Sequence, residues 1–86
     1  MKLYSLEELC IEVAIEEETL ESFIQREWLK PLDQDTMKFD DEDMRRLVLI
    51  LELQRDFNVN EEGLDIILHL LDQLNSLKKL TLHSKT

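Results

Sequence analysis

Carboxylates are the side chains of this chain that could do chemistry, and they crowd into one segment. Glu16, Glu17, Glu18 and Glu21 all fall within six residues. Paired carboxylates can act as acid and base where a cleft drives their pKa values apart, and exposed carboxylates attract cationic surfaces. The surrounding pattern predicts no such cleft. The chemistry expected of these residues is therefore the attraction of a positively charged partner.

The other reactive side chains form no catalytic or metal-binding pattern. His69 and His83 have no second His or Cys at ligand spacing. Cys10 has no basic neighbour in sequence that would lower its pKa, so it is expected to be a small buried apolar group. The one glycine, Gly63, cannot supply a phosphate-binding loop. We therefore expect no enzyme activity, no cofactor and no metal site.

The net charge of the chain is strongly negative, at −10 from 20 acidic and 10 basic residues. Residues 1–28 hold eight acidic residues against two basic ones, whereas residues 61–86 hold four against three. A field of this sign steers cationic partners toward the N-terminal half and repels nucleic acid and anionic membranes. The alternative is a solvated acidic surface that serves only solubility.

The cysteine content and the hydropathy of the chain indicate the cellular compartment in which the protein is located. A single Cys cannot form an internal disulfide, which suits a reducing environment. Glu7 and Glu8 interrupt any apolar signal core at the N-terminus, and no apolar run approaches the roughly 18 residues of a membrane span. These features predict a cytoplasmic protein.

Composition and patterning predict a single all-α domain over residues 1–80. Hydrophobic residues make up 43% of the chain, and there are only one glycine and one proline, which favours helices over turn-rich folds. Apolar periodicity and capping residues place four helices at about 6–13, 17–26, 41–56 and 61–80. Residues 81–86 are predicted to be a flexible tail.

Polar residues at the predicted helix ends support these bounds. Ser5 and Glu8 have the spacing of a capping box, and Ala14-Ile15 makes the turn between the first two helices. Asn58 can adopt the left-handed conformation that ends the third helix, and Asn60 can cap the fourth.

The segment between the second and third helices is expected to hold a small sheet. Pro31 ends the helical pattern because it lacks an amide donor and disfavours helix in the residue before it. Leu32 and the Met37-Lys38-Phe39 stretch are predicted to pair as a short two-stranded wing around the polar turn at residues 33–36.

Part of the acidic cluster has a purely structural explanation. Glu17 and Glu18 fall in the first turn of the helix at 17–26, where the helix dipole favours negative charge, but Glu21 lies beyond the reach of that effect. Asp40 and Asp41 open the helix at 41–56 in the same way and are further candidates for partner contact. Both acidic helix starts qualify as the contact surface.

The helix at 61–80 carries more apolar residues than one packed face needs. Leu64, Leu68 and Leu71 are expected to pack on the domain core. A second row has the 3-4-3 spacing of a coiled-coil seam and predicts a homodimer or a partner helix: Ile67, Leu70, Leu74 and Leu77. The alternative is a frayed helix with scattered exposed leucines.

In this frame the chain resembles the MerR-type winged helix-turn-helix family. That family reads Gly-Val-x-x-x-Thr-Leu-Arg-x-Tyr, then Gly-Leu-x-x-Pro, and after the wing Tyr-x-x-x-Asp-Leu-x-x-Leu. The corresponding residues here are Ala14-Ile15, Thr19-Leu20-Glu21, Phe23, Trp28-Leu29-Lys30-Pro31, Phe39, Asp43, Met44 and Leu47. The match covers roughly residues 4–75. It implies a MerR-like fold with a small two-stranded wing and a long C-terminal helix.

The departures from the family pattern fall on its DNA-contacting positions. Glu21 stands where the family has an Arg that contacts DNA, and the polar residues 33–36 replace a basic wing, which leaves only Lys38. Two like charges near contact cost about 1 kcal/mol even in a water-like dielectric. We therefore expect no direct binding to nucleic acid.

One branch of this fold fits the chain better. Residues 63–74, Gly-Leu-Asp-Ile-Ile-Leu-His-Leu-Leu-Asp-Gln-Leu, resemble the Gly-Ile-x-x-x-Leu-x-Leu-Met-Asp-x-Ile of the CbpM-type chaperone modulators, and residues 6–10 resemble their opening helix. Members of that family bind the J-domain of the DnaJ-like co-chaperone CbpA. They block its stimulation of the DnaK ATPase and weaken its DNA binding.

The resemblance implies an inhibitory module that covers the basic helix with which a J-domain docks on DnaK. Charge complementarity selects the expected partner contacts, which are Glu16, Glu17, Glu18 and Glu21, with Asp40 and Asp41 as further candidates. One alternative is a MerR-type transcription regulator that reads DNA through another surface, such as Arg45-Arg46. Another is an adaptor subunit whose acidic face is only a solvent coat.

Overall fold

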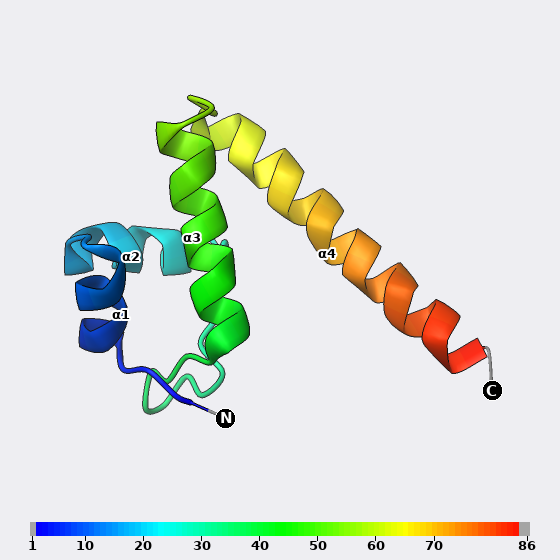
Figure 1. Cartoon of the computed structure of the whole chain (residues 1–86), viewed down its shortest axis with the longest axis horizontal. Helices are drawn as coiled ribbons and strands as arrows, with labels where there is room; N and C mark the ends of the chain where they lie inside the picture. The colour runs from blue at the N-terminus through cyan, green and yellow to red at the C-terminus, as the bar shows by residue number, and fades with distance from the viewer. Residues whose placement is uncertain (1, 85–86) are drawn as a thin grey trace.

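Four helices make up the regular structure of the protein (Figure 1). The computed structural model describes residues 2–84, and the side chains of residues 2–80. The helices are α1 (Leu6–Val13), α2 (Glu17–Gln25), α3 (Asp41–Arg55) and α4 (Glu61–Ser84). Each begins at the residue expected from the sequence, which confirms the all-α architecture. Helix α4 continues to Ser84 rather than ending near residue 80, and residues 85–86 of the expected tail lie outside the described part.

Side chains at the helix ends account for these bounds. The amide of Glu8 donates to Ser5 Oγ at 3.1 Å and the amide of Ser5 donates to Glu8 Oε1 at 2.9 Å, which completes the capping box. Ala14 has a left-handed φ of 56° that turns the chain from α1 into α2. Asn58 ends the turn after α3 with a φ of 55°. Asn60 Oδ1 then accepts the amide of Gly63 at 2.8 Å.

The hydrophobic core lies where α1, α2 and α3 meet the first turns of α4. Cys10 is buried within it, as expected from its place on the apolar face of α1. Helix α4 contributes two fully buried side chains, Leu64 and Leu68, both from its first half. The rest of α4 extends away from the other three helices (Figure 1). The buried core consists of Leu9, Cys10, Leu20, Phe23, Trp28, Leu29, Phe39, Leu47, Ile50, Leu51, Leu64 and Leu68.

Hydrogen bonds fix the orientation of α4 relative to the other three helices. The indole Nε1–H of Trp28 donates to Asp65 Oδ1. The guanidinium of Arg46 binds Asp72 through two hydrogen bonds, of 2.8 and 3.2 Å, and its Nε–H donates to the carbonyl oxygen of Trp28. A bidentate pair of this kind constrains direction as well as distance. Arg46 therefore ties α3 and the segment after α2 to α4.

The expected two-stranded wing is wrong. Residues 2–84 contain only two isolated antiparallel bridges, Asp33 with Lys38 and Tyr4 with Phe39. Asp33 Oδ1 accepts the amide of Asp35 at 2.9 Å, which stabilises the polar turn expected at residues 33–36.

The second half of that segment also cannot extend the pairing. Met37 has a left-handed φ of 52°, which breaks the extended conformation that a strand requires. Phe39 pairs with Tyr4 instead of the other side of the loop: the Tyr4 amide donates to the Phe39 carbonyl at 2.7 Å, and the Phe39 amide donates back at 2.9 Å. Pairing within the loop is therefore limited to Leu32 and Asp33 with Lys38, where the Leu32 amide donates to the Lys38 carbonyl at 2.7 Å.

Candidate functional site

The four glutamates at the start of α2 form one exposed acidic surface, which we call the α2 acidic surface. Glu16 is the N-cap residue, Glu17 and Glu18 lie in the first turn, and Glu21 follows one turn later. All four are exposed, and Glu16 makes no side-chain capping hydrogen bond. Among residues 2–80 no ion pair joins any of them to a cation. Their charges therefore remain available to a partner.

The field of this surface reaches the neighbouring helix. Burial raises the pKa of the Cys10 thiol, and the charges of Glu17 and Glu21 raise it further. The thiol is therefore held in its protonated, unreactive form at neutral pH. This agrees with a structural rather than a chemical role for Cys10.

Asp40 and Asp41 lie apart from the α2 acidic surface. They open α3, whose start lies away from the start of α2 in Figure 1. Asp40 is half-buried, and its Oδ1 accepts the amide of Asp43 at 2.9 Å as the N-cap of α3. Asp41 is exposed, and its Oδ1 accepts the hydroxyl of Tyr4 at 3.2 Å. The structure therefore does not join the two predicted sets of contacts, and it gives both aspartates a local role.

Asp43 is the one carboxyl of this region with a strongly shifted titration. Its Oδ2 accepts the amide of Asp40 at 3.0 Å, which completes a capping box. Burial raises the pKa of Asp43 to about 6, and the nearby charges of Asp40 and Glu42 also raise it. The unfolded value is about 3.9. Between these values the folded chain binds more protons than the unfolded chain, so ionisation of Asp43 costs stability as the pH rises.

Replacing Asp43 with Asn is expected to change the pH dependence of stability. The amide keeps an acceptor for the Asp40 amide and removes the charge whose pKa lies at about 6. Below about pH 4 the variant should match the wild type, and its relative free energy of unfolding should increase until about pH 7. Urea unfolding at several pH values measures this difference. A difference that stays constant over the window would contradict the assigned titration.

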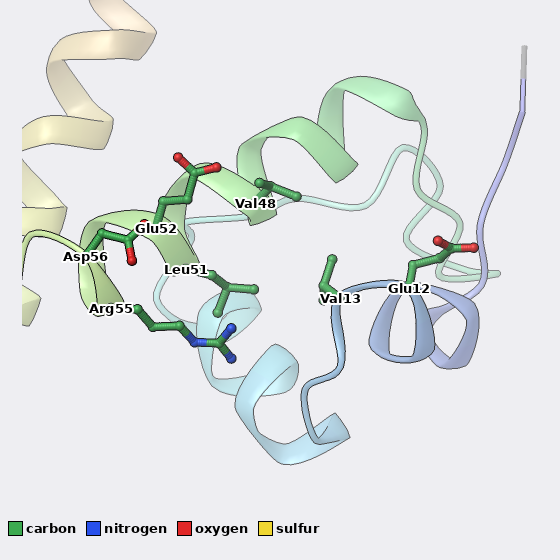
Figure 2. A pocket seen from close by; sticks show the side chains of 7 residues that line it. All are labelled: Glu12, Val13, Val48, Leu51, Glu52, Arg55 and Asp56. Carbon is green, nitrogen blue, oxygen red and sulfur yellow. The ribbon is translucent and has the colours of Figure 1, made fainter.

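A groove between the end of α1 and α3 brings together residues that the sequence did not predict as a site. It has a volume of about 310 Å³ and lies between Val13 on one side and Val48 and Leu51 on the other (Figure 2). Val48 is 38% exposed at the groove wall. The complete lining is Glu12, Val13, Val48, Leu51, Glu52, Arg55 and Asp56.

Comparison with known proteins identifies the scaffold. A family model described as MerR HTH family regulatory protein matches residues 4–81.

The chain belongs to the MerR family.

This assignment rests on almost the whole chain and agrees with the order of its helices. No curated protein and no solved structure gives a significant match. As a MerR-family protein the chain has the helix-turn-helix formed by α1 and α2. The family description is that of a regulatory protein, and it names no partner or reaction.

Arg45 and Arg46, which the sequence offered as an alternative DNA-binding surface, both lie beside acidic side chains. Arg46 is largely enclosed, with 22% of its side chain exposed, and its guanidinium is occupied by Asp72. Arg45 is exposed, but its guanidinium Nη2 lies 3.9 Å from Glu42 Oε1. Arg46 therefore has a structural role, since it joins α3 to α4.

The residues predicted to form a dimer lie along the part of α4 that extends from the body. Ile67 is half-buried, whereas Leu70, Leu74 and Leu77 are exposed, Leu74 to 48%. Ile66, on the same helix, is exposed as well. The MerR-family chain thus has an apolar row on α4 beyond the leucines that its own core buries.

Within residues 2–84, no helix has both the length and the apolar character needed to cross a membrane. Among the side chains that the structure describes, His, Cys, Asp and Glu do not cluster as they would around a metal ion.

Proposed function

We propose that this MerR-family chain is a chaperone modulator that binds the J-domain of a DnaJ-like co-chaperone and inhibits its action with DnaK. The observation that carries the proposal is the exposed α2 acidic surface, on a scaffold whose second helix would need cations to hold DNA. The resemblance of residues 63–74 to the CbpM-type modulators gives the identity of the partner.

Charge complementarity supplies the mechanism. A J-domain docks on DnaK through a basic helix, and such a helix is attracted by the carboxylates of Glu16, Glu17, Glu18 and Glu21. A modulator bound to that helix occupies the surface that DnaK needs. Inhibition therefore follows from competition, with no chemical step on this chain, and the protein acts as a binding module rather than an enzyme.

The test is a titration of the chain into DnaK whose ATPase activity is stimulated by a DnaJ-like co-chaperone. We expect the stimulated rate to fall to the basal DnaK rate, and added DnaK to restore it because the two proteins compete. The basal rate of DnaK without co-chaperone should stay unchanged and serves as the control. Full stimulation at excess modulator, with no J-domain binding by calorimetry, would refute the proposal.

A MerR-type DNA-binding regulator is the second candidate, and the family match favours it. Helix-turn-helix members of a regulatory family commonly reach DNA through phosphate contacts from cations. The engagement of Arg46 by Asp72 weighs against this candidate. Fluorescence anisotropy with duplex DNA at low salt separates the two, because tight binding with a steep salt dependence would favour the regulator.

We also propose that α4 forms a homodimer through Ile67, Leu70, Leu74 and Leu77. The exposure of Leu70 and Leu74 on the extended part of the helix supports it, because burying an exposed leucine stabilises a pair by removing apolar area from water. Sedimentation equilibrium measures the assembly. A single species with the 10.3 kDa mass of one chain at all concentrations would exclude the dimer.

A further inference from the structure

We propose that the groove between α1 and α3 binds an apolar side chain from a basic amphipathic helix of the partner protein. This inference rests on the proposed function for the identity of the partner, and on the groove itself for the chemistry that it selects. It assigns the central contact to a surface distinct from the α2 acidic surface.

The groove offers an apolar site of suitable size. Leu51 is 7% exposed and forms its floor, while Val13, half-buried, and Val48, 38% exposed, form its two walls. Its volume of about 310 Å³ lies at the lower end of the roughly 300–1,000 Å³ typical of ligand pockets. Such a site takes up one or two aliphatic side chains rather than a whole helix.

Carboxylates lie on both sides of this apolar centre. Glu12 lies at the α1 side, Glu52 lies on α3 at the other end, and Asp56 directly follows α3 (Figure 2). All three are exposed, and Arg55 is the only cation of the lining, so the rim has a net charge of −2. An apolar side chain flanked by cations would place those cations next to the rim carboxylates.

A helix presents this combination naturally. Residues three and four positions apart share one face of a helix, so a leucine can enter the groove while lysines or arginines on either side reach the rim. The net negative charge of the rim does not favour an acidic occupant. Nucleic acid is disfavoured for the same electrostatic reason.

The groove and the α2 acidic surface are expected to act on different rate constants. Exposed charges chiefly raise the association rate and its salt dependence, whereas a buried apolar anchor chiefly lowers the dissociation rate. The two surfaces can therefore be distinguished in one kinetic experiment on the full chain.

The test replaces Val48 with Glu, which places a charge in the groove wall at an exposed position. The matched control is Leu32→Glu, which makes a similar change at an exposed aliphatic residue outside the groove. The probes are a purified J-domain and a synthetic amphipathic helix that carries a leucine with lysines three and four residues away. Circular dichroism verifies that both variants keep the helical content of the wild type.

We expect Val48→Glu to weaken binding of each probe by about tenfold or more through faster dissociation, since it removes an anchor contact. Leu32→Glu should remain within about twofold of wild type, as surface changes outside an interface do. Equal affinities of folded Val48→Glu and wild type for the J-domain would overturn the groove assignment and leave the proposed function intact. Groove-dependent binding of the synthetic helix without any J-domain binding would support the groove and refute the proposed partner.

Discussion

Replacing Glu17 and Glu21 together with Lys is expected to weaken J-domain binding by about tenfold or more at low ionic strength, mainly through slower association. Both side chains are exposed on the α2 acidic surface, and each change turns an attraction into a repulsion. A contact pair of unit charges contributes about 1 kcal/mol in a water-like dielectric, and salt screens it. The difference from wild type should therefore shrink as the salt concentration rises. Stopped-flow or biolayer measurements of the association rate over a salt series record it.

A double variant with the same change in net charge provides the control. Asp35 lies in the loop before α3 and Glu62 lies in the first turn of α4, and both are exposed. Asp35→Lys with Glu62→Lys changes the total charge equally but leaves α2 intact. If both double variants lose the same affinity, only the total charge matters. If the Glu17 and Glu21 variant binds the J-domain as the wild type does, the α2 acidic surface takes no part in binding.

Replacing Trp28 with Ala is expected to lower the free energy of unfolding by about 3–5 kcal/mol, the usual cost of removing a large aromatic side chain from a core. Trp28 is buried, its ring centroid lies 5.5 Å from that of Phe23, and the guanidinium of Arg26 lies 5.2 Å from its ring. Its indole also holds Asp65 on α4. Domains of this kind have a total stability of only about 5–15 kcal/mol, so the variant should be close to unfolding.

Trp28→Phe separates the packing of the ring from its hydrogen bond. Phenylalanine fills most of the same volume but cannot donate to Asp65, so we expect a loss of about 1–2 kcal/mol. Urea unfolding followed by circular dichroism measures both variants, since Trp28 is the one tryptophan of the chain. A loss below about 1 kcal/mol for Trp28→Ala would show that the core does not depend on this residue.

The α2 acidic surface carries the charge that we propose selects the partner, and the contacts of Trp28 and Arg46 hold α4 in place. If α4 forms a dimer, its angle to the body decides how two acidic surfaces are presented together. Loss of the Arg46–Asp72 pair would then disturb the geometry of the assembly without changing the α2 acidic surface.

Most of the helical architecture could be predicted from the sequence because its determinants are local. A capping box spans four residues, as Ser5 to Glu8 does, and an apolar repeat shows which face of a helix is buried. Exposure of Glu16, Glu17 and Glu18 follows from the same pattern, since the apolar residues of α2 turn toward the core. The composition alone determined that the electrostatic field of the protein is negative.

Contacts between distant residues needed the tertiary structure. Arg46 and Asp72 are separated by 26 positions and Trp28 and Asp65 by 37, and nothing in their local sequence marks them as pairs. The predicted wing failed for the same reason, because Phe39 takes its hydrogen bonds from Tyr4, which lies before α1.

The groove shows the same division most clearly. The sequence by itself predicted that α1 and α3 are helices. Only the tertiary structure decided that Val48 stays partly open to solvent opposite Val13, because the crossing of two helices sets how far each apolar face is covered. Local periodicity defines the direction of a side chain, whereas its exposure depends on what packs against it.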